Sequence, residues 1–202
     1  MKKIFLLLLL ALALPTALFA KDNIDYTNSG GTLSGSNAGL SLTGSVLIAV
    51  NGLDGLGLVT GNDLGSVTFT TGALVSGSLQ MGGTFAAGGT FTITGNGTDG
   101  IPNGVLFTGT FSSPVVWTLV TLANGTHNYT LTGTLSGTTG SGYQTVGVTV
   151  QLTVNTGKGF FNGSTTISSG DTNVVVPEPG SLTLLATGLF AVAGAIRRRL
   201  KL

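Results

Sequence analysis

Apolar residues alternate with threonine, serine and glycine through most of the chain between residues 21 and 176. The clearest case is the segment 145–154, in which every second residue is aliphatic: Val146, Val148, Val150, Leu152 and Val154. Because successive side chains of a strand point to opposite faces, this period of two predicts strands with one buried and one solvent-facing side. No helical period of 3.6 residues persists in this part of the sequence, so the pattern predicts an all-β body.

One segment departs from this alternation. Residues 115–122 carry apolar residues on both faces of an expected strand, with Val116 and Val120 on one face and Val115, Trp117 and Leu119 on the other. A continuous apolar run of this kind is typical of a strand with both faces buried. We therefore expect this strand to lie between two layers.

Short turns separate the expected strands. Five Asn-Gly and two Asp-Gly pairs mark positions where tight turns need a positive φ, and they begin at Asn51, Asp54, Asn96, Asp99, Asn103, Asn124 and Asn162. Many short strands with such turns predict an antiparallel β-sandwich or a barrel-like body. A β-helix is the alternative, because the segment Gly-Thr-Leu-Ser-Gly occurs at both Gly31 and Gly133, although no fixed repeat period connects the two copies.

The first 20 residues have the organisation of a secretory signal peptide. Lys2 and Lys3 precede an apolar run over residues 4–14 that is too short to span a membrane, and Pro15 ends that run. Ala20 supplies a small residue before the cut, so we expect signal peptidase to cleave between Ala20 and Lys21. The mature protein would then begin at the expected all-β domain, residues 21–176.

The other end of the chain, residues 177–202, combines three features in a fixed order. The tetrapeptide Val176-Pro177-Glu178-Pro179 comes first, then an apolar segment over residues 181–196, then the cluster Arg197, Arg198 and Arg199. As a helix, the apolar segment is barely long enough to cross the hydrocarbon core. The arginines would keep its end on the cytoplasmic side as a topological stop, and the prolines would hold the preceding residues extended outside.

This order of features resembles the PEP-CTERM sorting signal of Gram-negative bacteria. The resemblance implies that exosortase, a membrane-embedded processing enzyme, recognises Val176, Pro177, Glu178 and Pro179. It further implies a protein that uses the inner membrane as a transit anchor and then reaches the cell surface or the extracellular exopolysaccharide, with a structural role in biofilm. An ordinary C-terminal membrane anchor is the alternative interpretation.

The charge distribution changes the picture given by the whole chain. The formal net charge is +1, but residues 21–176 hold two lysines and six aspartates, a net charge of −4. A mildly acidic body lacks the basic face that nucleic-acid binding requires, so we expect no nucleic-acid partner. The chain has no cysteine, and therefore no disulfide stabilises the exported body.

Residues suited to catalysis or metal binding are few. His127 is the only histidine and Glu178 the only glutamate, so we expect no cofactor, no metal site and no enzymatic activity. A glycan-active enzyme is the less favoured alternative, and it would use aspartates such as Asp54, Asp63 or Asp99, each of which also suits a turn. The Gly- and Asp-rich segment 95–100 offers Asn96 and Asp99 either to a weakly bound Ca²⁺ or to a plain turn.

A carbohydrate-binding or adhesive module is the remaining alternative. Its usual platform is a set of exposed aromatic rings, but most aromatic residues here fall on the apolar face of an expected strand, where they belong to a core. The pair Phe160-Phe161 is the exception, because polar residues surround it and one ring is expected to be exposed.

Overall fold

The computed structural model describes residues 23–176 of the 202-residue chain. The expected signal peptide, the cut between Ala20 and Lys21, the tripeptide 177–179, the membrane helix 181–196 and the cluster 197–199 lie outside the described residues. Those assignments therefore stay predictions. Within the described residues, no helix is long and apolar enough to cross a membrane.

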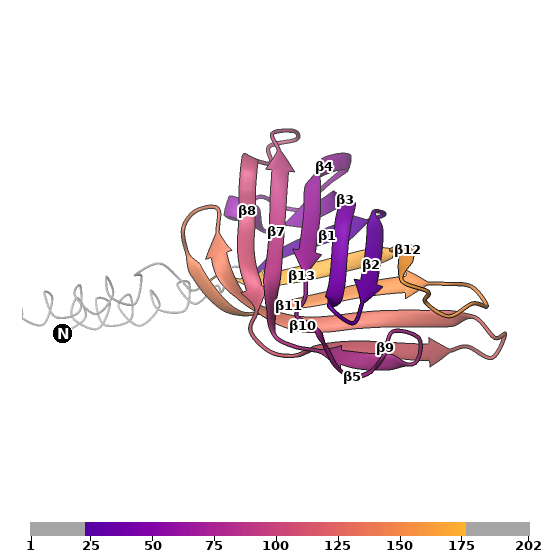
Figure 1. Cartoon of the computed structure of the whole chain (residues 1–202). Helices are drawn as coiled ribbons and strands as arrows, with labels where there is room; N and C mark the ends of the chain where they lie inside the picture. Colours follow the sequence, from indigo (N-terminus) through magenta and orange to yellow (C-terminus); the bar gives the residue numbers. More distant parts are fainter. Residues whose placement is uncertain (1–22, 177–202) are drawn as a thin grey trace, which may run out of the picture. The chain divides into compact units, whose positions relative to one another are not determined.

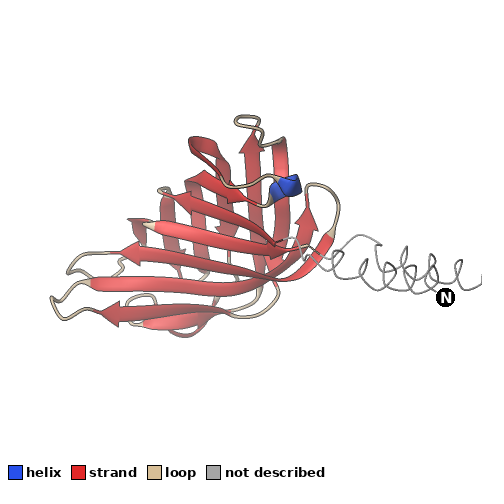
Figure 2. Ribbon diagram, turned by 180° about the vertical axis from the view of Figure 1, so that it is seen from behind, coloured by secondary structure: helices blue, strands red, loops and turns tan. Residues whose placement is uncertain are grey.

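Strands make up almost the whole body, as the alternating pattern predicted, and the single short helix is a 3-10 turn (Figure 2). In chain order the elements are β1 (Asn23–Ser29), β2 (Thr32–Ser36), β3 (Gly39–Asn51), η1 (Leu53–Gly55), β4 (Val59–Thr70), β5 (Leu74–Ser78), β6 (Gly82–Phe85), β7 (Gly88–Asn96), β8 (Asn103–Phe111), β9 (Val115–Thr121), β10 (His127–Thr139), β11 (Gln144–Asn155), β12 (Ser164–Thr166) and β13 (Ser169–Val175).

Eight of these strands close into an antiparallel barrel. Their order is β1-β3-β4-β7-β8-β10-β11-β13, and β13 pairs with β1 to complete the circle. The barrel alternative of the sequence prediction is thereby confirmed. The β-helix alternative is wrong for the described residues, because all their strand pairings are antiparallel, whereas the coils of a β-helix stack parallel strands.

Two of the long strands, β3 and β10, also pair with strands outside the barrel. β10 pairs with β8 through Leu135–Thr139 and with β9 through His127–Thr132, so β9, β6 and β5 form a branch. In the same way, β3 pairs with both β1 and β2, and β2 carries β12. All of these strands belong to one hydrogen-bonded sheet, in which β2, β3, β4, β7 and β8 run in one direction and β9, β10 and β11 run across them (Figure 1).

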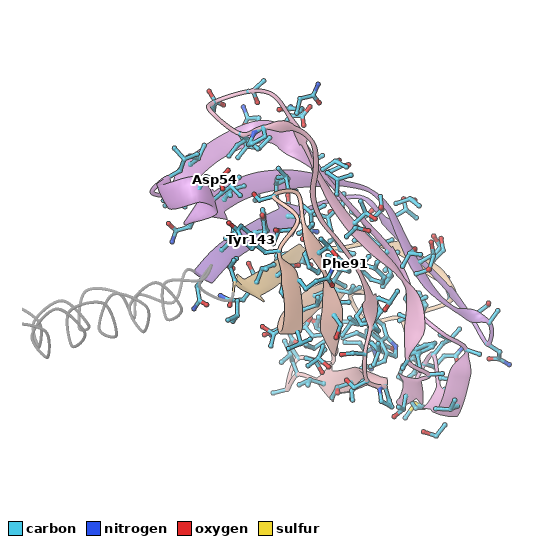
Figure 3. The ribbon with its side chains drawn as sticks, turned by 90° about the vertical axis from the view of Figure 1, so that its left-hand side faces the viewer. Asp54, Phe91 and Tyr143 are labelled. Carbon is cyan, nitrogen blue, oxygen red and sulfur yellow. The ribbon has the colours of Figure 1, made fainter. Side chains whose placement is uncertain are left out.

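Aromatic rings fill the space that these strands enclose. Phe69 stacks on Phe91 with ring centroids 5.9 Å apart, and the edge of Phe111 meets both rings. Figure 3 shows Phe91 among the side chains that the strands enclose. In the branch, Trp117 stacks on Tyr129 at 4.9 Å. Burial of such large rings is the main stabilising contribution available to a body without disulfides.

A β-bulge corrects the prediction for the segment 145–154. Val148, Val150, Leu152 and Val154 are buried as expected, but Val146 is 75% exposed. Leu135 pairs with Val148 and the next residue, Ser136, pairs with Val146, so Gly147 has no partner on β10. Because Gly147 is one residue more than the partner strand has, the residues before it point to the opposite face from the one that strict alternation predicts. Val146 therefore faces solvent, and Thr145 is buried instead.

The prediction that residues 115–122 are buried on both faces is wrong. Val115 and Trp117 lie in the core, but Val116 and Val120 are 44% and 48% exposed. The reason is the place of β9 in the branch outside the closed barrel, where only one of its faces packs on other strands. The apolar run therefore leaves valines on the surface.

The Asn-Gly and Asp-Gly pairs correctly marked the places where the chain needs a positive φ. Asp54 and Asp99 themselves adopt φ values of 49° and 52°, and the glycine after each is also positive. One pair differs, because Asn103 and Gly104 are the first two residues of β8 and not part of a turn.

Candidate functional site

The aspartates proposed from the sequence as carboxylate candidates are all exposed and lie in different elements. Asp54 is part of η1 and lies at the surface in Figure 3, Asp63 lies in β4, and Asp99 follows β7. The positive φ values of Asp54 and Asp99 show that both residues shape turns, a conformation that aspartate tolerates better than most residues. Within residues 23–176, no three His, Cys, Asp or Glu side chains gather closely enough to hold a metal ion.

The segment 95–100 also forms a turn through its own side chains. The Asn96 side-chain oxygen accepts hydrogen bonds from the Thr98 main-chain N–H at 3.1 Å and from the Thr98 hydroxyl at 2.6 Å. The Asn96 amide donates to the main-chain oxygen of Asp63 at 2.7 Å. The polar atoms of Asn96 that a calcium ion would need are therefore engaged in holding the turn and joining it to β4.

A different pair of aspartates lies close together in the structure. Asp25 on β1 and Asp171 on β13 project from adjacent strands, where Thr27 pairs with Asp171 and Asp25 with Asn173. The Thr27 hydroxyl donates to Asp171 at 2.9 Å. Burial raises the pKa of Asp25, and the negative charge of Asp171 raises this pKa further. Sequence reasoning missed this pair because 146 positions separate its members.

His127 is buried between β10 and the segment after β11. Its imidazole stacks on Phe160 with ring centroids 4.2 Å apart, and Nδ1 lies 3.3 Å from the main-chain oxygen of Gly159. Phe160 is 47% exposed while Phe161 is buried, so the expectation of one exposed ring in this pair is confirmed. The histidine ring therefore packs Phe160 against the end of β10.

The two ends of the described body lie side by side. Asn23 pairs with Val175, and Ile24 pairs with Val174, so the first and last strands form one antiparallel ladder. Ile24 and Val174 are buried, and half-buried Val176 packs against the hydrophobic core. The folded body therefore continues through Val176, and Pro177 follows it with no intervening linker residue.

Comparison with protein families concerns this same end of the chain. A family model described as the PEP-CTERM protein-sorting motif matches residues 175–199. The chain carries a PEP-CTERM motif. The comparison with curated proteins gives no match, and neither does the comparison with solved structures.

The PEP-CTERM motif indicates export and exosortase processing at the membrane on the way to the cell surface. The matched region begins at Val175, which is still part of β13. Of the four recognition residues proposed from the sequence, the structure places Val176, half-buried against the core. The start of the motif thus overlaps the end of strand β13 of the barrel.

Proposed function

We propose that this protein is a non-enzymatic structural component of the matrix outside the cell, delivered there by its two terminal signals. Signal peptidase removes residues 1–20, and the helix 181–196 then holds the chain in the inner membrane with Arg197–Arg199 on the cytoplasmic side. Exosortase recognises Val176–Pro179, with Glu178 as the recognition charge, and releases the body toward the exopolysaccharide.

The observation that carries this proposal is the direct succession of a compact barrel and the sorting motif. The core closes within residues 23–176, and the last packed side chain, Val176, is also the first residue of the tetrapeptide. Cleavage after this point would detach the membrane segment and leave the hydrophobic core complete. Because cleavage would remove no residue of the core, the tail can serve for delivery alone without contributing to the folded body.

The surface of the body agrees with a role in a hydrated matrix. The outward positions of the strands are mainly threonine and serine, which offer hydroxyls while keeping a high β propensity. Each of the eight barrel strands has a partner on both sides, and the two branches end in the short strands β5 and β12, which limits uncontrolled edge-to-edge aggregation at high local concentration.

Processing in the native host tests this proposal. We expect Glu178→Ala, and separately a deletion of residues 197–199, to leave the unprocessed chain in the membrane fraction, as measured by fractionation and by the intact mass of the protein. Asp63→Ala is the matched control, since it removes an exposed carboxylate outside the motif and should mature like the wild type. Normal maturation of either tail variant would overturn the sorting assignment.

A further inference from the structure

A groove of about 460 Å³ lies on the outer face of the sheet formed by β9, β10, β11 and β13. Its side chains alternate with core residues along each strand, so they point away from the barrel interior. On β10, for example, Leu131 is buried and Thr132 is exposed, and on β11 Leu152 is buried and Gln151 is exposed. The volume falls within the range of small-molecule sites in proteins.

Strand pairing arranges the groove as two parallel rows of side chains that cross the strands. Val116, Thr132, Gln151 and Asp171 form the first row, because each is the register partner of the next. Thr134, Thr149 and Asn173 form the second row in the same way. The paired main chains of Gly133 and Val150 lie between the rows and form the floor.

The dimensions follow from sheet geometry. The rows are two residues apart along each strand, which is roughly 7 Å, and the first row spans four neighbouring strands, which is roughly 14 Å at the usual strand spacing. Ser113 and Pro114 close the end beside Thr134, where the Ser113 and Thr134 hydroxyls are hydrogen-bonded at 2.5 Å. The groove is therefore about as wide as one extended polymer chain built from six-membered rings.

Most of the side chains that line the groove are neutral and carry a hydroxyl or amide group, while the exposed lining surface itself is more apolar than polar. Hydroxyls of Thr132 and Thr149 and the amide groups of Gln151 and Asn173 can each donate and accept hydrogen bonds. Asp171 is the only charged residue in the lining, and its Oδ1 already accepts from Thr27. Val116 and Pro114 add a small apolar surface at the opposite end. Such a set matches a ligand that carries many hydroxyls and short apolar C–H faces.

Other ligand classes fit less well. An anionic polymer would meet the Asp171 carboxylate and the neighbouring Asp25 with no lysine or arginine among the lining residues to offset them. A peptide strand would need a free strand edge, but β11 is paired with β10 and β13 along the groove, and β10 is paired with β11 throughout and with β9 as far as Thr132. A lipid or an aromatic compound would cover the hydroxyl and amide groups of the lining without offering them hydrogen-bond partners.

We propose that this groove binds a neutral saccharide chain that lies across β9, β10, β11 and β13. The Thr132 and Thr149 hydroxyls and the Gln151 and Asn173 amides exchange hydrogen bonds with sugar hydroxyls, and the second carboxylate oxygen of Asp171 accepts a hydrogen bond from one sugar hydroxyl. This inference names a ligand class for the proposed matrix role. It rests on that proposed function only in assuming that the protein encounters polysaccharide outside the cell.

Calorimetric titration of the full-length chain in detergent tests the groove. The probes are cellohexaose, maltohexaose and mannohexaose as neutral chains and hexagalacturonate as an anionic chain. We expect at least one neutral hexaose to bind and hexagalacturonate to bind more weakly. The double variant Thr132→Val/Thr149→Val keeps the shape of both side chains but removes two hydroxyls, and should weaken binding about tenfold or more.

The control variant is Thr108→Val/Thr110→Val, two exposed threonines of β8 that do not line the groove. It should bind like the wild type, and Gln151→Ala provides an independent groove variant if the double variant does not fold. The inference is overturned if no neutral hexaose binds, if the groove variants bind like the wild type, or if binding is lost in EDTA, which would indicate a cation instead. Tail processing of the groove variants should stay normal, so a failure here is distinguishable from a failure of the sorting proposal.

Discussion

Asn23, the first residue of β1, lies opposite Val175, the last residue of β13, in the antiparallel ladder that closes the barrel. The chain therefore enters and leaves the body on adjacent strands at the same end of that ladder. One consequence is that the segment joining the body to the sorting motif starts from hydrogen-bonded, partly buried structure rather than from a flexible linker.

A linker at this junction should affect processing. Inserting six Gly and Ser residues between Val175 and Val176 keeps the tetrapeptide intact and separates it from the end of β13, so we expect maturation at least as fast as in the wild type. The reason is that a processing enzyme binds an extended segment, whereas Val176 packs against the hydrophobic core in the present junction. Pulse-chase labelling followed by electrophoresis gives the rate.

The same linker placed after Ser141, in the exposed turn between β10 and β11, serves as the control and should leave the rate unchanged. Slower maturation with the junction linker alone would show that exosortase contacts the barrel end itself, contrary to this expectation.

Two buried tyrosines should respond in opposite ways to the loss of their hydroxyls. The Tyr129 hydroxyl donates to the Gln80 main-chain oxygen at 2.7 Å and accepts from the Phe161 N–H at 3.0 Å. Tyr129→Phe leaves both groups without this partner, and we expect it to lower the free energy of unfolding by about 2–3 kcal/mol.

The Tyr26 hydroxyl, in contrast, is buried and finds no hydrogen-bond partner among residues 23–176. Tyr26→Phe removes an unpaired polar group, so the free energy of unfolding should stay the same or rise by about 1 kcal/mol. Guanidinium unfolding followed by Trp117 fluorescence measures both variants. If both substitutions lowered the free energy of unfolding by the same amount, this assignment of the hydrogen bonds would be contradicted.

Gly65 allows two strands to approach closely. Its φ is 148°, and a Cβ at this position would overlap the main-chain oxygen of Thr94 on β7. Because main chain cannot move aside as a flexible side chain does, we expect Gly65→Ala to lower the free energy of unfolding by about 2 kcal/mol or more. Gly57→Ala is the control, since nothing lies within 4 Å of its Cβ position. A tolerated Gly65→Ala in thermal unfolding would show that β4 and β7 can separate at this point.

Asp25 should make the stability of the body depend on pH. Burial, and then the charge of Asp171, raise its pKa above 3.8 in the folded state. The folded protein thus holds this proton more tightly than the unfolded chain, so the contribution of Asp25 to stability is fully present below pH 3.8 and is lost as the pH rises through the folded pKa.

Asp25→Asn removes the penalty on the ionised carboxylate. We expect this variant to be more stable than the wild type near pH 7, by less than about 1 kcal/mol because water screens a half-exposed group. The difference should shrink on acidification toward pH 3.8, and Asp171→Asn should reproduce part of the gain. Urea unfolding at several pH values measures both effects. A stability difference between variant and wild type that grows on acidification would contradict the raised pKa of Asp25.

Local features of the sequence correctly predicted much of the body. The strand around Phe91 and Ile93 follows from alternation alone, and the turns at Asp54 and Asp99 follow from residues that tolerate a positive φ. Such features can be predicted from the sequence because the conformation of each residue depends mainly on its neighbours in the chain. The same locality explains the errors at Val146 and Val116, whose exposure depends on a bulge and on the absence of a covering layer.

The sequence by itself determined the all-β character, the positions of most strands, and the sorting motif, which is a linear signal read from consecutive residues. Only the tertiary structure decided that eight strands close into a barrel, that Asn23 meets Val175, and that Thr132, Thr149 and Asp171 line one groove. The physical reason is that a period of two specifies which face a side chain occupies but not which strand lies beside it. That choice depends on hydrogen-bonded register and packing between residues far apart in the chain.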